Sequence, residues 1–524
     1  MRFFILFLAL GLGACDEAPE RSSAKRPNII LFLVDDMGWQ DTSVAFHEET
    51  TPLNQHFRTP AMERLASNGV RFTQAYAAAV CSPTRTAIMT GQNPVRHQVT
   101  NWTLFPDRDQ SGETERLRAP DGWRKEGLQP GQVTLPQLLG EAGYRTIHCG
   151  KAHWGAHGTE GSDPTKLGFD INIAGHAAGA PGHYHGEENY GNETAGSYTL
   201  PWGVPGLESY HGTETHLTDA LTIEALAAIE QAVLDQRPFY LYMAHYAVHT
   251  PLQEHRPYVD HYRGQIYPGT EIPIPEVEAI YASMVAGMDA SLAQILARLE
   301  ELGVAEDTLV LFASDNGGLS AHARGTTPMG TGKETHNGPL KAGKGSAYEG
   351  GTRIPLIVSW ARLEPGNDLQ NRISIKPGSR QALPVISEDY FPTLCAWAGV
   401  EIPESYWSEL DGLDFSGSLA VAGDPGMDRT LLFHYPHVWG PAGLGYEPHS
   451  AIRKGVWKAV YFYEPERWEL YNLADDIGES DDLAARRPDK LGELAEAMRS
   501  EFERLGAQFP VNKETGAAEL PDWP

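Results

Sequence analysis

Four short, largely apolar runs constrain the fold of this chain more than any other feature of its sequence. They span residues 28–34, 144–148, 239–244 and 308–313. Apolar runs of this length predict strands that are buried on both faces, as in a parallel sheet covered by helices. Segments with apolar residues at helical spacing, such as 218–234 and 277–302, lie between them. We therefore predict an α/β fold with a large central sheet, mostly parallel or mixed, flanked by helices.

Each apolar run is followed by polar side chains of the kinds that bind ligands or carry protons. In chain order these are Asp35 and Asp36, Lys151 and His153, His245 and His249, and Asp315 and Asn316. Ligands of α/β proteins bind beyond the carboxyl ends of the strands, which meet at one edge of the sheet. The sequence therefore predicts that the four groups contribute to a single site.

Two of these groups offer only oxygen ligands. They are Asp35, Asp36, Asp315 and Asn316. Three carboxylates that converge on one point cannot all stay ionised without a cation, and calcium is favoured over zinc because no Cys or His pair at zinc-like spacing accompanies them. The alternative is that the first pair caps a helix and that the second forms a turn with the glycines after it. Their joint appearance after two buried strands favours a calcium site.

The segment 81–91 predicts a helix with a cysteine at its start. Pro83 suits the first turn of a helix, and Gly91 suits its end. Cys81 would then experience the positive potential of a helix N-terminus beside Arg85, which favours a reactive sulfur and an anionic ligand. The alternative is an inert, buried cysteine.

A glycine-rich segment, residues 337–355, carries Lys344. Together with Arg85, Lys151, His153 and His249, this lysine supplies cations and proton carriers that suit a sulfate group. The alternative is that Lys344 is solvated at the surface and that the histidines are structural.

The motifs in this chain resemble those of type I, formylglycine-dependent sulfatases of the alkaline phosphatase superfamily. The resemblance extends from about residue 26 to residue 479. It rests on motifs that occur in the order of the family: Asn-Ile-Ile-Leu-Phe-Leu-Val-Asp-Asp-Met-Gly at 28–38, Cys-Ser-Pro-Thr-Arg at 81–85, Gly-Lys-Ala-His-Trp-Gly at 150–155, Ala-Val-His-Thr-Pro at 247–251, Ser-Asp-Asn-Gly-Gly at 314–318, the Lys344 segment and Glu-Leu-Tyr-Asn-Leu at 469–473.

This resemblance implies a cofactor, a maturation partner and a mechanism. Cys81 would be oxidised to formylglycine by a formylglycine-generating or an anaerobic sulfatase-maturating enzyme. Calcium would be bound by Asp35, Asp36, Asp315, Asn316 and the modified Cys81, and the sulfate would be surrounded by Arg85, Lys151, His153, His249 and Lys344. One hydroxyl of the hydrated aldehyde would attack sulfur while His249 or Lys344 protonates the leaving oxygen. His153 would accept the proton of the second hydroxyl as sulfate is expelled.

The N-terminus predicts export. Met1-Arg2 precedes the apolar run 3–12, which is right for a signal peptide and too short to span a bilayer. Leu12-Gly-Ala-Cys15 resembles a bacterial lipobox, so we predict a signal peptide over 1–15, a lipid anchor on Cys15 and a polar tether over 16–26. A plain signal peptide cleaved nearby is the alternative. We see no other run long enough to span a membrane, and we expect the protein to be lipid-anchored in the periplasm or at the outer membrane or cell surface.

The order of strand-like and helical segments divides the rest of the chain into two parts and a tail. We predict a catalytic α/β domain over 27–428 and a smaller α+β subdomain over 429–505. The strand-like pieces of the subdomain, 430–435, 450–453, 457–463 and 468–471, have no helix between them and suggest a small antiparallel sheet. A helix over 488–505 follows, and 506–524 is a tail.

Charge and cysteine content narrow the partners. The formal net charge of -28 argues against nucleic acid and against an anionic membrane surface. It does not exclude an anionic substrate, because salt screens surface charges beyond about 8–10 Å. Cys149 and Cys395 do not make a disulfide framework, although a single bridge between them is compatible with the sequence.

The substrate is expected to be a sulfated carbohydrate, such as an algal polysaccharide or a glycosaminoglycan fragment. Aromatic and polar loop residues suit a sugar ring, although ordinary loop decoration is the alternative. These residues are His97, Asn101, Trp102, His176, His183, His185 and His211. Segment 99–103 and the long Gly- and His-rich loop resemble bacterial polysaccharide-utilisation sulfatases and favour galactose-type sugars. The rival interpretations are a phosphonate or phosphodiester hydrolase of the same superfamily and a non-catalytic carbohydrate-binding lipoprotein.

Overall fold

The computed structural model describes residues 25–192, 201–325, 336–423, 429–440 and 443–524. The expected signal peptide, Cys15 and most of the expected tether lie outside the described residues.

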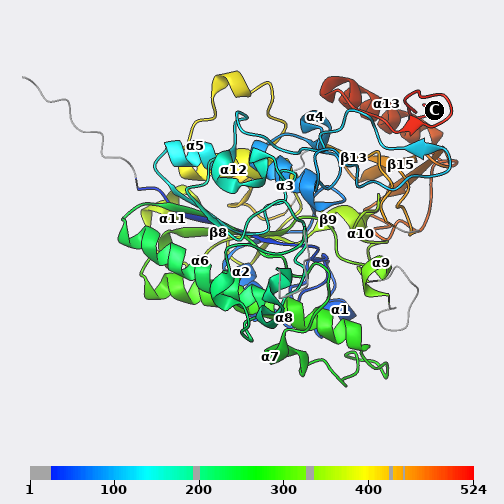
Figure 1. Cartoon of the computed structure of the whole chain (residues 1–524). Helices are drawn as coiled ribbons and strands as arrows, with labels where there is room; N and C mark the ends of the chain where they lie inside the picture. The colour runs from blue at the N-terminus through cyan, green and yellow to red at the C-terminus, as the bar shows by residue number, and fades with distance from the viewer. Residues whose placement is uncertain (1–24, 193–200, 326–335, 424–428, 441–442) are drawn as a thin grey trace, which may run out of the picture.

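A mixed sheet of eight strands forms the centre of the molecule (Figure 1). In spatial order its strands are β11 (Ser379–Gln381), β2 (Val70–Phe72), β10 (Leu356–Trp360), β8 (Thr308–Ser314), β1 (Asn28–Val34), β7 (Phe239–Ala244), β5 (Arg145–Gly150) and β6 (Ile171–Ile173). The four apolar runs of the sequence are β1, β5, β7 and β8, which are adjacent and parallel. Only the far side departs from this pattern, because β10 runs antiparallel to both β8 and β2. The prediction of a large, mostly parallel or mixed sheet is confirmed.

Alternate residues of β1 enter two hydrophobic cores, one on each face of the sheet. Ile30 and Phe32 pack with α2 (Pro60–Asn68), α6 (Leu217–Leu234) and α8 (Glu276–Glu301). Ile29 and Leu31 pack with α3 (Cys81–Thr90), α5 (Leu135–Glu141) and α12 (Tyr390–Ala398) on the opposite face. Figure 1 shows these two helical layers on either side of the sheet. Burial on both faces explains why β1 is apolar at every position.

Helix α8 differs from one expectation. By length and composition it is the one described helix that would be able to cross a membrane, although we saw no such run outside the N-terminus. However, 72% of its most apolar stretch is buried inside the fold, so α8 is a core helix.

A smaller antiparallel sheet follows near the C-terminus. Its strands, in order, are β13 (Thr430–Tyr435), β14 (His449–Lys454), β15 (Trp457–Phe462) and β16 (Arg467–Asn472). One face packs against α13 (Pro488–Leu505), and the other packs against Tyr76 and Tyr348 of the larger part. The segment 506–524, expected to be a tail, includes β17 (Val511–Asn512), which pairs with β4 (Leu117–Arg118).

The remaining elements are short. The helices are α1 (Pro52–His56), α4 (Pro94–His97), α7 (Arg256–Val259), α9 (Ala321–Arg324), α10 (Glu349–Thr352) and α11 (Asp368–Arg372), and the strands β12 (Val385–Ile386), β3 (Ala75–Tyr76) and β9 (Arg353–Ile354) form a small third sheet. Short 3-10 segments lie at Glu160–Ser162, Pro164–Leu167, Gly186–Gly191, Glu208–Tyr210, Ala305–Asp307, Ser387–Asp389, Glu404–Tyr406 and Ser416–Ser418.

Candidate active site

The polar groups that follow β1, β5, β7 and β8 meet at one edge of the central sheet. Three buried ion pairs hold them together. Lys151 Nζ lies 2.7 Å from Asp35 Oδ2, Lys344 Nζ lies 2.6 Å from Asp36 Oδ1, and Arg85 Nε lies 2.8 Å from Asp315 Oδ2. Removing either member of such a pair would leave an uncompensated charge in the interior.

The neighbouring aspartates have opposite electrostatic environments. Burial raises the pKa of Asp35 well above its ordinary value, even though the charge of Lys151 opposes the shift. Burial also acts to raise the pKa of Asp36, but Lys344 and other positive neighbours outweigh it and hold this pKa below its ordinary value. Of these two carboxylates, Asp36 is therefore the one that stays ionised more firmly.

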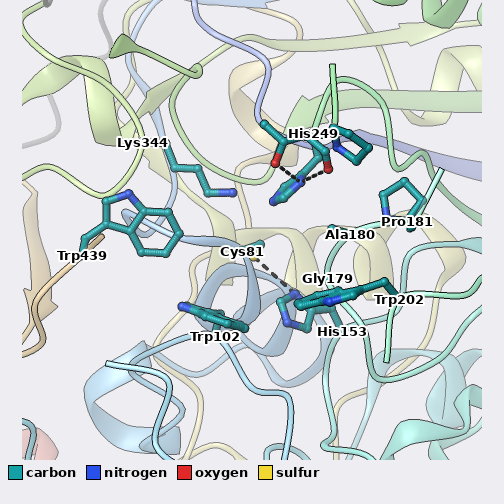
Figure 2. Close-up of a pocket in the computed structure, with 13 residues that line it drawn as sticks. Cys81, Trp102, His153, Gly179, Ala180, Pro181, Trp202, His249, Lys344 and Trp439 are labelled. Carbon is teal, nitrogen blue, oxygen red and sulfur yellow. Dashed lines mark hydrogen bonds between the residues drawn. The ribbon is translucent and has the colours of Figure 1, made fainter. Parts of the chain in front are cut away.

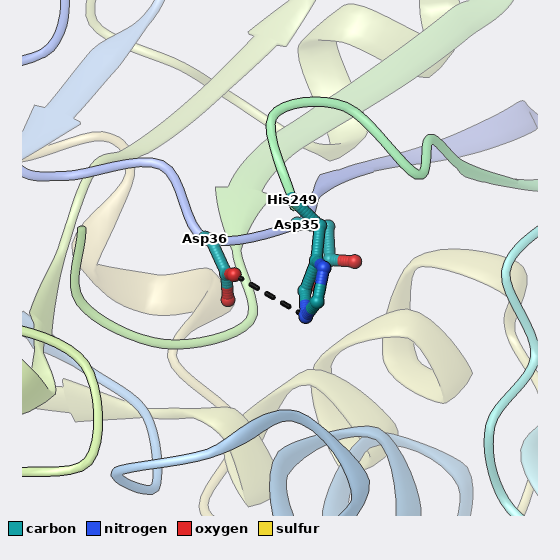
Figure 3. A group of neighbouring side chains, drawn as sticks. All are labelled: Asp35, Asp36 and His249. Carbon is teal, nitrogen blue, oxygen red and sulfur yellow. Dashed lines mark ion pairs between the residues drawn. The ribbon is translucent and has the colours of Figure 1, made fainter. Parts of the chain in front are cut away.

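The oxygen-rich part of the site fits a hard divalent cation. Asp35 Oδ1 and Asn316 Oδ1 are buried and have no hydrogen-bond partner. Asp35, Asp36 and His249 each offer a ligand atom within 4.8 Å of the others (Figure 3). Unpaired carboxylate and amide oxygens are the ligands that calcium prefers.

This donor set differs in part from the expected one. Asp315 is adjacent, but its Oδ2 accepts from Arg85 and its Oδ1 accepts from the backbone N–H of Asp36. His249 was not expected among the ligands, yet its Nε2 lies 3.6 Å from Asp36 Oδ2. Four residues separate His249 from the end of β7, so strand position alone does not reveal that it reaches the two aspartates.

Cys81 is the first residue of α3 and faces a histidine. Its Sγ lies 3.3 Å from His153 Nδ1, while His153 Nε2 donates to the carbonyl of Thr103 at 2.8 Å. Because Nε2 carries the proton in that bond, Nδ1 is left as an acceptor facing position 81. Burial, reinforced by the charges of Lys151 and Arg85, lowers the pKa of His153 well below its usual value. His153 is therefore neutral.

The sulfur itself is not activated as the sequence suggested. Burial raises the pKa of the Cys81 thiol, although Lys151 and Lys344 act in the opposite direction. Two nitrogens of Arg85 bond to other groups, Nε to Asp315 and Nη1 to the carbonyl of Lys151. As an unmodified cysteine, this residue is a weak nucleophile.

A cavity of about 450 Å³ opens above Cys81 (Figure 2). It is lined by Cys81, Trp102, His153, Gly179, Ala180, Pro181, Gly182, Trp202, His249, Thr250, Pro251, Lys344 and Trp439. Four of the residues expected from the sequence to act on sulfate therefore line it, whereas Arg85 and Lys151 lie beneath it, paired with aspartates. Gly179 permits this arrangement, because a Cβ there would come within 2.2 Å of the His153 ring.

Of the loop residues expected to contact sugar, Trp102 lines the cavity and the others do not. His97 is buried, with Nε2 on the carbonyl of Pro83 and Nδ1 accepting from the N–H of Val99. Asn101 is also buried and uses its amide to hold Trp102, Ser111 and Tyr435.

The histidines of the long loop also lie outside the lining. His176 supports the site through its backbone, because its carbonyl accepts from the N–H of His153. His183 bonds Gln253, His185 lies against the ring of His216, and His211 lies against Tyr190. Polar loop composition therefore did not distinguish residues that face the cavity from residues that build its walls.

Sequence reasoning missed two further lining residues, Trp202 and Trp439. Both are followed directly by glycine in loops, at Trp202-Gly203 and Trp439-Gly440. A large aromatic residue in a glycine-rich loop was the available signal, because such a residue has little strand or helix packing to explain it. Cys149 and Cys395 are buried and free, so the bridge left open by the sequence is not formed.

Comparisons with known proteins show the family of this chain. A family model described as sulfatase matches residues 27–400. A sulfatase of Formosa agariphila is 29% identical, with 90% of this chain and 86% of that protein aligned. N-acetylgalactosamine-6-sulfatase of Canis lupus familiaris is 30% identical, with 91% and 78% aligned. The crystal structure of Ps i-CgsB in complex with k-i-k-neocarrahexaose is 26% identical, covers 95% of each chain and has a TM-score of 0.68. This chain therefore belongs to the sulfatase family and is a sulfuric ester hydrolase.

Proposed function

We propose that this enzyme removes sulfate from a sulfated carbohydrate and that its nucleophile is formylglycine made from Cys81. The observation that carries the proposal is the position of Cys81, which starts a helix, lines the cavity and bonds His153. The weak nucleophilicity of the unmodified thiol also favours a modified residue, since burial raises its pKa. The partner required is a formylglycine-generating or anaerobic sulfatase-maturating enzyme.

The surrounding side chains suggest how protons move. His153 Nδ1 faces position 81 without a proton of its own, which suits the acceptor role. His249 Nδ1 donates to the carbonyl of Thr250 at 2.8 Å, and burial lowers the pKa of His249 to about 3. The Nε2 of His249 therefore has no proton to donate. The Asp36 carboxylate, against the effect of burial, holds the pKa of Lys344 above its ordinary value, so Lys344 carries a proton. We infer that Lys344 is the group that protonates the leaving oxygen.

A calcium ion completes the proposed site. Asp35, Asp36 and Asn316 would hold it, with Asp315 and position 81 alongside, and the unpartnered oxygens of Asp35 and Asn316 support this assignment. When bound, the ion would supply positive charge that polarises the nucleophile and the sulfate oxygens. Lys151, paired with Asp35, and Arg85, paired with Asp315, keep these carboxylates in position.

A saccharide substrate is supported by two kinds of observation. The relative in the solved complex is named with a neocarrahexaose, and another relative is named for N-acetylgalactosamine 6-sulfate hydrolysis. The cavity presents indoles, which suit the apolar faces of sugar rings. We propose a galactose-type sugar on these grounds.

We also propose export and a lipid anchor on Cys15, because segment 1–15 has an apolar run followed by residues that resemble a bacterial lipobox. Partition of the full chain and of Cys15→Ala into detergent tests this. The wild type should enter the detergent phase, and the variant should stay in the aqueous phase. Equal partition of both would contradict the anchor.

The activity is tested by paired kinetics of the maturated enzyme on 4-nitrophenyl sulfate and on matched nitrophenyl phosphonate and phosphodiester substrates. We expect kcat/KM for the sulfate ester to exceed the others by about 100-fold or more, because the chain matches the sulfatase family and carries its motifs around Lys151, His249 and Lys344. The reverse ratio would favour the phosphonate or phosphodiester hydrolase. No turnover of any ester by protein that contains formylglycine would favour a non-catalytic binding lipoprotein.

A further inference from the structure

Three tryptophans from distant segments surround the cavity above Cys81. Trp102 follows α4, Trp202 belongs to the long loop before α6, and Trp439 follows β13. Figure 2 shows Trp439 beside Lys344 and Trp202 beside Gly179 and His153. The proposed reaction at sulfur does not use any of the three indoles, so their position around the cavity requires a separate explanation.

Trp439 is fixed to the segment that carries Lys344. Its ring packs on Gly345, where a Cβ would come within 2.0 Å of Trp439 Cδ1. Lys344 Nζ lies 5.4 Å from the centre of the same ring, which is within the range of a cation–π contact. The indole therefore has a defined position relative to the lysine.

Trp102 is fixed to the segment that holds His153. Its backbone N–H donates to Asn101 Oδ1 at 2.8 Å, and the same oxygen accepts from the hydroxyl of Tyr435. The next residue, Thr103, provides the carbonyl that accepts from His153. The ring of Trp102 therefore sits on backbone that is held on both sides.

Trp202 is held by the opposite wall of the cavity. Its carbonyl accepts from the N–H of Gly182 at 2.7 Å. Gly182 in turn meets Gly191 so closely that a Cβ on it would lie 2.7 Å from Gly191 Cα. Rigid aromatic surfaces placed in advance bind a ligand at a low entropic cost.

Among the described residues that line the cavity, Lys344 carries the positive charge, and it lies beside Trp439. Among its lining residues, the ionisable ones are Cys81, His153, His249 and Lys344. The remaining ones are glycine, alanine, proline, threonine and the three tryptophans. A carboxylate or second sulfate placed against Trp202, on the side away from Lys344, would lose water without gaining a charged partner among the described lining residues, which is costly.

We propose that Trp102, Trp202 and Trp439 form a subsite for an uncharged sugar ring, and that this subsite selects neutral monosulfated saccharides over rings that carry a second anionic group. The inference rests on the proposed function, in that the substrate is taken to be a saccharide. A pyranose presents C–H groups on its faces, and a galactose-type ring, with its axial hydroxyl, has one face covered by them. Indole faces bind such surfaces by excluding water from both.

The test is competition against hydrolysis of 4-nitrophenyl sulfate by the maturated full-length enzyme. The probes are methyl galactoside 4-sulfate, methyl galactoside 6-sulfate, the 4,6-disulfate and inorganic sulfate. For the wild type, we expect the better monosulfate to inhibit at a concentration at least about 30-fold lower than the disulfate, since a second charge without a partner beside Trp202 is unfavourable. Inhibition by inorganic sulfate measures binding at the Cys81 part of the cavity only, because this ion has no sugar ring.

Variants at Trp202 sharpen the test. Trp202→Ala should weaken monosulfate inhibition by about 10-fold and leave inhibition by inorganic sulfate within about twofold, because only the sugar loses contact. Trp202→Phe should restore most of the loss. Trp202→Arg should reduce the ratio of the inhibitory concentrations of the disulfate and the monosulfate by about 10-fold, since the arginine supplies the missing cation. Trp407→Ala, at an indole that is 62% exposed and outside the cavity lining, is the matched control and should change nothing.

Two results would overturn the inference: equal inhibition by the monosulfates and the disulfate, or unchanged monosulfate inhibition in Trp202→Ala. If Trp202→Ala does not fold, Trp202→Phe and Trp202→Arg take its place. The inference then requires Trp202→Phe to prefer the monosulfates over the disulfate more strongly than Trp202→Arg does. Failure of the proposed function looks different, because protein containing formylglycine would then release no sulfate from 4-nitrophenyl sulfate in the first place.

Discussion

His153 Nδ1 lies 3.3 Å from Cys81 Sγ, and the other nitrogen of the same ring is committed to the carbonyl of Thr103. The backbone therefore decides which nitrogen of His153 faces position 81. That nitrogen carries no proton and its surroundings keep the ring neutral. Whatever oxygen replaces the sulfur meets a proton acceptor in a fixed position.

Loss of this acceptor should slow turnover much more than it weakens binding. We expect His153→Ala to lower kcat for 4-nitrophenyl sulfate by about 10²–10⁴-fold, the usual contribution of a general base, with a small change in KM. Steady-state kinetics check this, provided that the formylglycine content of the variant matches that of the wild type. A kcat within tenfold of the wild type would remove His153 from the proton-transfer role.

If Lys344 is the proton donor, the loss of kcat on its removal should depend on how poorly the leaving group departs. Lys344→Met should lower kcat for a sulfated sugar, whose alkoxide leaves poorly, by about 10³-fold or more, and that for an aryl sulfate by much less. A His249→Ala variant should not show this difference between the two leaving groups. Equal losses on both substrates in Lys344→Met would contradict the assignment.

Calcium should stabilise the protein as well as support turnover. Removal of divalent ions with a chelator should lower Tm and activity, and added calcium should restore both, since a ligand at 100 times its Kd contributes about 2.7 kcal/mol. Asn316→Ala should weaken the calcium-dependent shift in Tm. A wild-type Tm that does not change with added calcium would contradict the proposed calcium site.

A second buried ion-pair network joins the two parts of the fold. Lys458 Nζ lies 2.9 Å from both Glu349 Oε1 and Glu479 Oε1, and all three side chains are buried. Lys458→Met would leave the Glu479 carboxylate without its cation, while Glu349 keeps its pair with Arg353, and should lower the free energy of unfolding by about 3–5 kcal/mol. Lys513→Met, which removes an exposed pair with Glu113, is the control and should cost less than about 1 kcal/mol. Thermal unfolding of both variants measures the difference.

Asp289 should give stability a pH dependence of unusual sign for a carboxylate. Burial raises its pKa to about 7 in the native state, opposed by hydrogen bonds from the N–H groups of Ala61 and Met62. The native state then binds a proton that the unfolded state has released, so this contribution is full below about pH 4 and is lost as pH rises through about 7. At most it amounts to about 4 kcal/mol.

Asp289→Asn removes this titration. The difference in Tm between wild type and variant should therefore shift in favour of the variant as pH rises from 4.5 to 7.5. A constant difference over that range would show that Asp289 does not titrate there.

The parallel core of the fold was readable from the sequence because burial on both faces leaves an apolar run at each strand. β1 and β7 were predicted with their observed ends, and β8 was one residue longer than predicted. β10 was missed as a partner of β8, because an apolar run does not encode the direction in which it pairs. The register between distant strands depends on packing that a local pattern does not contain.

The Cys81 end of the site was also readable, since each of its charged residues follows a strand or lies in a recognisable motif. The sugar end was not. His97 and Trp102 look equally suitable in the sequence, yet His97 is satisfied by backbone groups beneath α3 while Trp102 faces the cavity. Which side of a loop faces the ligand is set by tertiary contacts such as those of Asn101, and local composition does not report them.

The central claim, that Cys81 becomes the formylglycine nucleophile, is tested most directly by mass spectrometry of the peptide that contains it. The protein should be exported by its own host or co-expressed with a formylglycine-generating enzyme. We expect a mass about 18 Da below that of the cysteine form, with a hydrated partner, and sulfate release in proportion to the converted fraction. Unmodified cysteine in protein that hydrolyses sulfate esters at full rate, or complete conversion without hydrolysis, would contradict the account.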